Sequence, residues 1–132
     1  GGCGFCLLNS AVIGAFHALK GLGAQRVGVV DFDVHHGNGS AELVQRLVQE
    51  NKVHENRVRY FSTHLLEKFE DPSLDFFPGS GDQDIGNMIK SYPLAPQWTT
   101  DSKTLTTSPH QGRQGFRNQF SSLISDLEAF KP

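Results

Sequence analysis

The 132-residue chain is predicted to adopt an α/β fold built on a parallel β-sheet. Residues 26–32 are rich in valine, as expected of a fully buried strand in a parallel sheet. Residues 41–49 carry apolar side chains at helical spacing, and residues 57–63 again read as a strand. A strand, a helix and a strand within about 35 residues make a βαβ unit with parallel strands and a right-handed crossover.

Two helices are expected in the first half of the chain. Over residues 7–19 apolar side chains recur at helical spacing, Asn9 or Ser10 can cap the start, and a Gly-Leu-Gly segment ends the helix. The helix over residues 41–49 has Ser40 as its expected N-cap. Each helix therefore has a start signal and an apolar stripe that can face the sheet.

The second half is less regular until its last helix. Residues 65–84 form a long loop, and loops of this length are usually functional or disordered. The adjacent Phe76 and Phe77 favour a functional loop, the alternative being a hydrophobic plug that anchors the loop to the body. A short strand is expected over residues 88–94, and a helix with a broad apolar stripe over residues 112–130.

Composition limits the classes of partner. The formal net charge is −2, and Lys and Arg do not cluster, so no nucleic-acid footprint is visible. No apolar run reaches the length of a membrane span. We therefore expect neither nucleic acid nor membrane as a direct partner.

Cys3 and Cys6 form a Cys-x-x-Cys pair. We interpret them as buried or helix-start thiols. A redox pair or a zinc knuckle is the alternative, but a zinc knuckle needs two further ligands.

Residues 31–39 contain two carboxylates and two imidazoles that could bind a metal ion. Asp31, Asp33 and His35 are spaced by two, so on an extended backbone they point to the same side. Two carboxylates and an imidazole suit Zn²⁺ or another divalent ion, and a site with few protein ligands leaves a position open for water. The alternative is a solvated strand end that caps the next helix. Together with His36 and the glycine turn, the pattern favours a metal site.

The expected topology brings these residues to one edge of the sheet. Ligands in open α/β sheets bind at the carboxyl ends of the strands. Asp33 and His35 follow the first predicted strand, and His64 follows the second. We therefore expect all three at the same edge.

Four motifs follow one another along the chain in a recognisable order. They occupy residues 4–10, 30–39, 62–64 and 76–81. Together they resemble the zinc-dependent histone deacetylase family, nearer its class II branch because Asn38 stands where other members have Asp. The resemblance implies the arginase-like fold, a three-layer α/β arrangement with helices on both faces of a parallel sheet, present here incompletely. It covers almost the whole chain and weakens over residues 88–110.

The resemblance implies roles for the metal-proximal positions. Asp33 and His35 match two of the family's three zinc ligands, and one zinc ion is expected. Asp31 matches a residue that orients a catalytic histidine, and Asn38 matches the partner of a catalytic histidine. Asp31, Asp33, His35 and Ser62 together match a potassium site nearby.

The implied substrate is the acetylated lysine of a histone or another protein, whose acetamide is hydrolysed. Phe5 and Phe77 match the two aromatic walls of the channel that admits such a side chain, and a narrow apolar slot suits its long aliphatic stem. A corepressor-type complex is an implied partner, and the nucleus and/or the cytoplasm the implied location. An acetylpolyamine or related small-amide deacetylase of the same fold, or a non-catalytic remnant that acts only as a binding module, is the alternative.

The domain prediction is that residues 1–132 form the central part of a single histone deacetylase catalytic domain, truncated at both ends. In the family, tandem catalytic histidines precede the first motif and a third ligand, an Asp, follows on a later strand. The chain alone is therefore expected to be inactive, because it contains two of three zinc ligands and no upstream general base.

Overall fold

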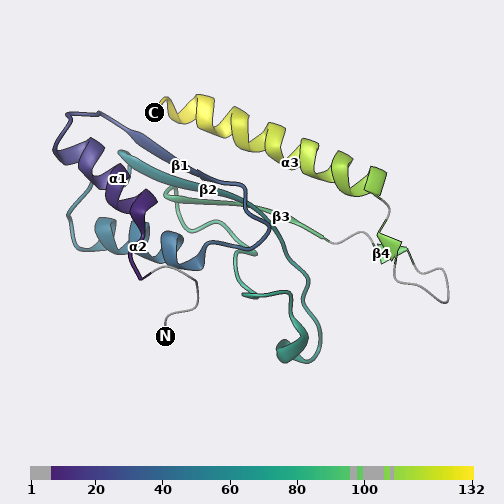
Figure 1. Ribbon diagram of the computed structural model, residues 1–132. Helices are drawn as coiled ribbons and strands as arrows, with labels where there is room; N and C mark the ends of the chain where they lie inside the picture. The colour runs from purple at the N-terminus through teal and green to yellow at the C-terminus, as the bar shows by residue number, and fades with distance from the viewer. Residues whose placement is uncertain (1–6, 96–97, 100–105, 108) are drawn as a thin grey trace.

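The computed structural model describes residues 7–95, 98–99, 106–107 and 109–132 (Figure 1). The elements come along the chain in the order α1 (Ser10–Lys20), β1 (Val27–Asp31), α2 (Asn38–Gln49), β2 (Val58–Leu65), the short 3-10 helix η1 (Pro72–Leu74), β3 (Ile89–Leu94), β4 (Trp98–Thr99), β5 (Thr106–Thr107) and α3 (Pro109–Phe130). Strands β1, β2 and β3 form a parallel sheet in that order, and β4 pairs with β5 in antiparallel fashion.

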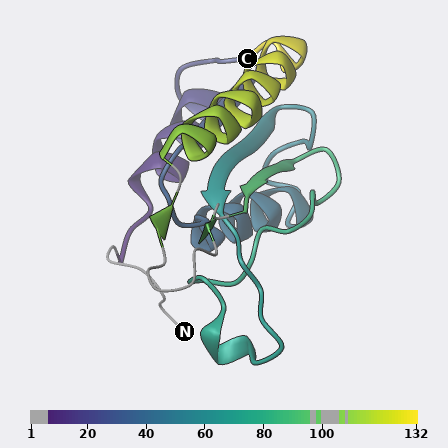
Figure 2. The same ribbon diagram turned by 90° about the vertical axis from the view of Figure 1, so that its right-hand side faces the viewer.

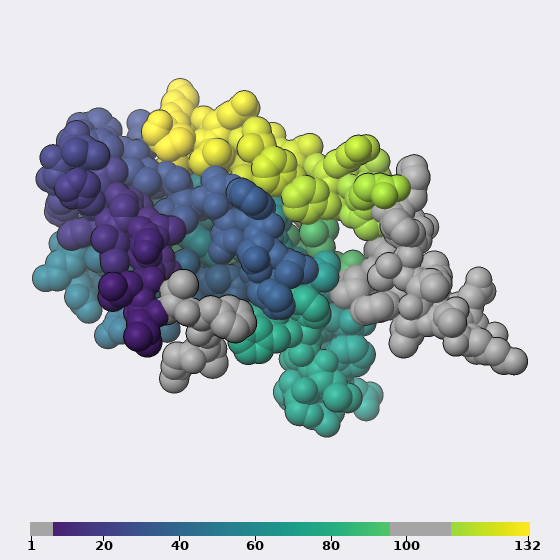
Figure 3. Space-filling view, viewed as in Figure 1, coloured from purple at the N-terminus to yellow at the C-terminus, as the bar shows by residue number. Residues whose placement is uncertain are grey.

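Helices cover both faces of the parallel sheet. Helices α1 and α2 lie on one face and α3 on the other, as Figures 1 and 2 show from two directions. This three-layer arrangement confirms the predicted α/β fold. Because all three strands run the same way, their carboxyl ends meet at one edge of the sheet. The long loop between β2 and β3, coloured teal, projects beyond that edge (Figure 3).

Strand β2 divides the core into two halves. Successive side chains of a strand point to opposite faces, so Tyr60 packs with α1 and α2 while Phe61 packs with α3. The first half is built around fully or nearly fully buried aliphatic residues, namely Val12, Leu19, Ala41, Val44, Val58 and Ile89. The second half is smaller and is built from Phe61, Tyr92, Leu123 and Phe130.

The end of α3 is attached to the start of the sheet by polar contacts. Arg26 Nη1 donates to the carbonyl of Phe130 at 3.0 Å. The Arg59 guanidinium lies 4.5 Å from the centre of the Phe130 ring, within the range of a cation–π interaction. Arg26, just before β1, and Arg59 of β2 thus hold the last turn of α3 against the sheet.

Several element boundaries differ from the sequence prediction. Asn9 caps α1 as expected, accepting from the Val12 N–H at 3.0 Å. The prediction that Ser40 caps α2 was wrong, because the helix begins at Asn38, after Gly37. The Ser40 hydroxyl instead accepts from Asn9 Nδ2. Helix α3 also begins earlier than predicted, at a proline, which is well suited to the first turn of a helix.

The first strand is less buried than predicted. The sequence of β1 indicates a fully buried strand, yet all five of its residues are only half-buried. Within the described residues β1 pairs with β2 alone, so its other edge has no neighbouring strand. Strand β2, which has a neighbour on each side, is buried along most of its length.

None of the helices in the described part of the chain has the length and apolar character needed to span a bilayer.

A substitution at Leu123 tests how much the second half of the core contributes to stability. Its side chain is fully buried between α3 and the sheet, so Leu123→Ala is expected to lower the free energy of unfolding by about 2–5 kcal/mol. Ile13→Ala on α1 is the control, because Ile13 is mostly exposed and its loss should cost below about 1 kcal/mol. Urea unfolding measures both. Equal losses would show that α3 does not pack on the sheet as described.

Candidate functional site

The candidate site lies where the loops after β1 and β2 meet at the carboxyl edge of the sheet. Residues 32–37 connect β1 to α2, and residues 66–84 fold back over the same edge (Figures 1 and 2). The N–H of Leu65, the last residue of β2, donates to the Val34 carbonyl at 2.9 Å, which ties the first loop to the start of the second. The two candidate zinc ligands, Asp33 and His35, and the aromatic residues Phe76 and Phe77 belong to these two loops.

Asp31, the last residue of β1, is fixed by two hydrogen bonds. The Tyr60 hydroxyl donates to Asp31 Oδ2 at 2.7 Å, and the Asp33 N–H donates to Asp31 Oδ1 at 3.1 Å. Tyr60 is fully buried, and burial together with the Asp31 carboxylate raises the pKa of its hydroxyl well above the usual value, so it remains a donor. A Cβ at Gly37 would overlap both the Tyr60 hydroxyl and the Asp31 carboxylate.

Asp33 and His35 form an exposed pair of metal-type donors. Asp33 Oδ1 accepts from the His35 N–H at 2.8 Å and lies 3.2 Å from His35 Nδ1. Their side chains are 66% and 48% exposed. The extended backbone from which their proximity was predicted ends at Asp31. The chain bends there. The carboxylates of Asp31 and Asp33 each accept from the N–H two residues later, and this turn brings the side chains of Asp33 and His35 together.

The geometry of this pair fits a zinc ion. Two donors, each about 2.0–2.1 Å from a tetrahedral zinc, lie about 3.3 Å apart, close to the observed separation of Asp33 Oδ1 and His35 Nδ1. The same separation suits an ordinary hydrogen bond between imidazole and carboxylate. Within the described residues, no group of three or more His, Cys, Asp or Glu side chains is placed to hold a metal. The structure thus brings the two predicted ligands together, and their role stays a prediction.

His36 and His64 form a buried pair away from those donors. His36 Nδ1 is hydrogen-bonded with Ser80 Oγ at 2.8 Å. Both ring nitrogens of His64 are also engaged, Nδ1 with Ser62 Oγ at 2.9 Å and Nε2 with the Gly81 carbonyl at 3.0 Å. The two ring centres are 4.6 Å apart. His64 lies at the expected edge of the sheet, but its nitrogens serve this buried network.

Burial keeps both histidines neutral near pH 7. Removal from water, followed by the influence of His64, lowers the pKa of His36 to about 4. Removal from water likewise lowers the pKa of His64, although Gly81, Asp31 and Ser62 oppose the shift. A neutral imidazole can both donate and accept a hydrogen bond, as the network of these rings requires.

The aromatic residues of the long loop lie against His35. The rings of His35 and Phe76 stack with centres 5.4 Å apart, and Phe77 meets His35 edge-on at 6.1 Å. Phe77 is 56% exposed, so it is not the buried plug considered as an alternative. Its partner in the predicted channel, Phe5, lies outside the described residues, as do Cys3 and Cys6.

Two further predicted site residues take defined positions. Ser62 is fully buried on β2, directly opposite Asp31 in the strand register, and its hydroxyl contacts His64. Asn38 begins α2 and is half-buried. Their roles toward potassium and a catalytic histidine stay predictions. Sequence reasoning missed Tyr60, although a tyrosine in a buried strand usually needs a hydrogen-bond partner, which was the available signal.

Comparison with known proteins gives concordant matches. The family model described as histone deacetylase domain matches residues 1–132. The chain is 32% identical over 130 residues to type-2 histone deacetylase 2 of Dictyostelium discoideum, covering 98% of this chain and 7% of that protein. It is 40% identical over 78 residues to a probable deacetylase of Methanothermobacter thermautotrophicus, covering 59% and 19%, respectively. It is 41% identical over 64 residues to the polyamine deacetylase HDAC10 of Rattus norvegicus, covering 48% and 10%.

The Tyr60–Asp31 contact gives the first prediction from this site. Tyr60→Phe removes the donor to a half-buried carboxylate and should lower the free energy of unfolding by about 1–3 kcal/mol. It should also weaken zinc binding roughly tenfold, because Asp31 holds the turn that carries Asp33. Urea unfolding and calorimetric zinc titration measure the two effects.

Tyr92→Phe is the matched control for this prediction. The Tyr92 hydroxyl donates to Asp126 Oδ2 at 2.6 Å, between β3 and α3. This substitution should cost comparable stability and leave the zinc affinity unchanged. An equal loss of affinity in both variants would show that Tyr60 has no specific influence on the turn.

The buried histidines predict a loss of stability in acid. Because the folded-state pKa of His36 is lowered from 6.5 to about 4, the unfolded chain binds more protons between these values, and stability falls as the pH falls through this window. The loss attributable to His36 should reach about 3 kcal/mol near pH 4. Denaturant unfolding near pH 7 and about pH 4.5 should show a weaker pH dependence for His36→Asn than for the wild type. An identical dependence would contradict the assignment.

Proposed function

Since the chain belongs to the histone deacetylase family, we propose that it forms the central part of a catalytic domain that hydrolyses the acetamide of acetyl-lysine in histones or other proteins. The chain spans 7%, 19% and 10% of the three relatives described above. The observation that carries the proposal is the exposed Asp33–His35 pair with Phe76 and Phe77 beside it.

Asp33 and His35 would hold a zinc ion in this proposal. When bound, zinc polarises an amide carbonyl and acidifies a bound water, the chemistry that amide hydrolysis requires. The stack with Phe76 orients the His35 ring, and the Asp33 carboxylate fixes the His35 backbone by accepting from its N–H. Asp31, held by Tyr60, keeps the turn in place beneath the pair.

The aromatic residues would receive the substrate. The exposed Phe77 ring lies next to His35, so the aliphatic stem of an acyl-lysine can pack on it while the amide approaches the metal. In the same proposal, Asp31, Ser62 and the backbone of residues 33 and 35 enclose a potassium ion. The strand register that places Asp31 opposite Ser62 supports this arrangement.

A small-amide deacetylase is the second candidate. The similarity to a protein named polyamine deacetylase supports it. An acetylated polyamine offers the same acetamide on an aliphatic stem, so the same pair of ligands and the same aromatic wall would serve. The substrate preference separates the two candidates.

The test is hydrolysis of an acetyl-lysine peptide by the intact catalytic domain that contains these residues, loaded with zinc. Asp33→Asn should lower kcat/KM by more than about 100-fold, because even residues that only support metal ligands cost 10–100-fold when changed. Asp71→Asn is the matched control. Asp71 is exposed and likewise accepts from the N–H two residues later, but that N–H belongs to Ser73 of η1 and not to the pair, so the loss of Asp71 should leave kcat/KM unchanged.

The outcomes separate the candidates. Turnover of the peptide that Asp33→Asn abolishes supports the lysine deacetylase, and a much higher kcat/KM for N-acetylputrescine supports the small-amide enzyme. Unaltered turnover in Asp33→Asn would remove Asp33 from the metal site. Binding of the peptide without any hydrolysis would indicate a non-catalytic binding module.

A further inference from the structure

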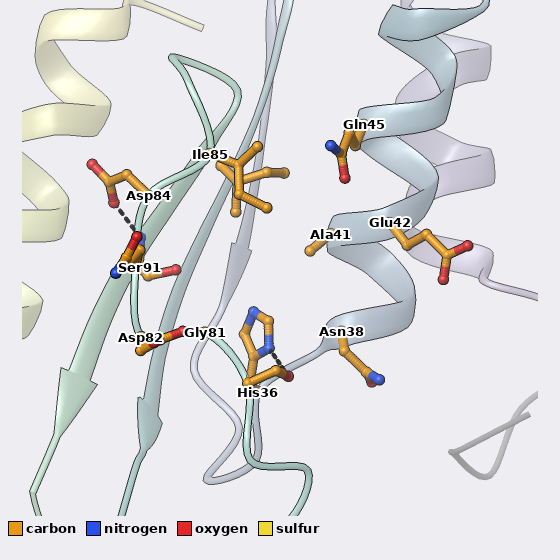
Figure 4. Close-up of a pocket in the computed structure, with 13 residues that line it drawn as sticks. His36, Asn38, Ala41, Glu42, Gln45, Gly81, Asp82, Asp84, Ile85 and Ser91 are labelled. Carbon is orange, nitrogen blue, oxygen red and sulfur yellow. Dashed lines mark hydrogen bonds between the residues drawn. The ribbon is translucent and has the colours of Figure 1, made fainter. Parts of the chain in front are cut away.

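A cleft separates α2 from the chain that leads into β3, on the side of the sheet covered by α1 and α2. Its volume is about 400 Å³, within the range of small-molecule sites. The ligand contacts proposed below involve five of the residues that line it, His36, Ala41, Ile85, Ile89 and Ser91. Figure 4 shows the helix on one side and the segment of Asp84 and Ile85 on the other.

Among the described residues, two buried polar atoms of this cleft have no hydrogen-bond partner. His36 is only 7% exposed. Its Nδ1 is hydrogen-bonded with Ser80 Oγ, while its Nε2 has no hydrogen-bond partner among the described residues. Figure 4 shows the ring directed upward between Ala41 and Ile85. The hydroxyl of Ser91, across the cleft, is also unpaired. Buried polar atoms are almost always paired in folded proteins, so two unpaired atoms around one space indicate that something binds there.

The shape of the cleft does not depend on a ligand. The backbones of Ile85 and Ile89 exchange two hydrogen bonds of 3.1 and 3.2 Å, which closes the turn that forms one wall. Asp84 reinforces this wall by accepting from the Ser91 N–H at 2.9 Å and from Lys90 Nζ at 2.8 Å. At the base, a Cβ on Gly81 would overlap the rings of His36 and His64. Glycine therefore keeps this space open.

The lining favours an uncharged ligand. Asp82 and Asp84 are already paired with Lys68 and Lys90 at 3.0 and 2.8 Å. The carboxylate of Glu42 points away from the cleft in Figure 4. The remaining surface is largely aliphatic, from Ala41, Ile85 and Ile89. A buried charge without a counter-charge is costly, whereas a neutral group that donates and accepts hydrogen bonds suits both unpaired atoms.

We propose that this cleft binds a small neutral amphiphile, an aliphatic stem that ends in a carboxamide or a hydroxyl group. The polar end pairs with His36 Nε2 and Ser91 Oγ, and the stem packs on the aliphatic wall. The proposal does not rest on the proposed function, because His35 and His36 are directed to different surroundings. Its test measures binding and not hydrolysis, so the two can fail separately.

The test is a titration of the full 132-residue chain, labelled with ¹⁵N at histidine, with pentanamide and with 1-pentanol. The ring nitrogen signals of His36 report the contact directly. We expect a saturable shift of the Nε2 signal with a Kd on the order of 1 mM, as suits ligands of this size. Butylammonium and pentanoate carry similar stems with a charge and should bind at least about tenfold more weakly.

Two substitutions locate the site. Ser91→Ala removes one hydrogen-bonding group and should raise the Kd about tenfold, while Ser121→Ala on the exposed face of α3 should leave it unchanged. Ala41→Leu places a larger side chain in the cleft and should abolish the shift, with circular dichroism confirming that the variant is folded. If Ala41→Leu does not fold, the comparison of the Kd values of Ser91→Ala and Ser121→Ala locates the site by itself.

Three results would overturn the proposal. Absence of a saturable His36 shift with both neutral probes would mean that the cleft holds water only. Equal affinity for the charged and neutral probes would exclude the proposed ligand class. Identical Kd values for Ser91→Ala and Ser121→Ala would place the binding elsewhere.

Discussion

The hydrogen bond from Tyr60 to Asp31 connects the core to the candidate site. Tyr60 is fully buried in the central strand, so its hydroxyl is fixed by the packing of α1 and α2. Asp31 receives this bond and in turn fixes the backbone of Asp33. Gly37 passes so close that it has no room for a side chain. The position of the exposed Asp33–His35 pair thus derives from the rigidity of the sheet, as preorganised sites require.

The consecutive residues His35 and His36 lie in different surroundings at the edge of the sheet. His35 is half-exposed and stacks on Phe76, where its nitrogen can meet a metal. His36 is buried and holds Ser80, so it anchors the far end of the loop that carries Phe76 and Phe77. One turn therefore supplies both a candidate ligand and the support for the aromatic residues beside it.

The sequence predicted the features that depend on local patterns and missed those that depend on distant neighbours. The βαβ order, the Asn9 cap and the closeness of Asp33 and His35 follow from spacing and residue type. The half-exposed state of β1 depends on which strands lie beside it, and composition does not reveal that. The Tyr60–Asp31 bond depends on strand register across 29 positions, which no local pattern encodes.

The attachment of Ser80 and Gly81 to the buried histidines has a consequence for how this loop can vary. Phe77 lies beside His35 at one end, and the chain is held again at Ser80, three residues later. Insertions or deletions between these two points would displace Phe77 from the Asp33–His35 pair or break the hydrogen bonds of His36 and His64. Residues 70–74 are exposed and lie beyond the Phe69–Asp75 hydrogen bond, so a change of length there is absorbed in solvent. Diversity in loop length among related chains should therefore concentrate before Phe76 and be absent after it.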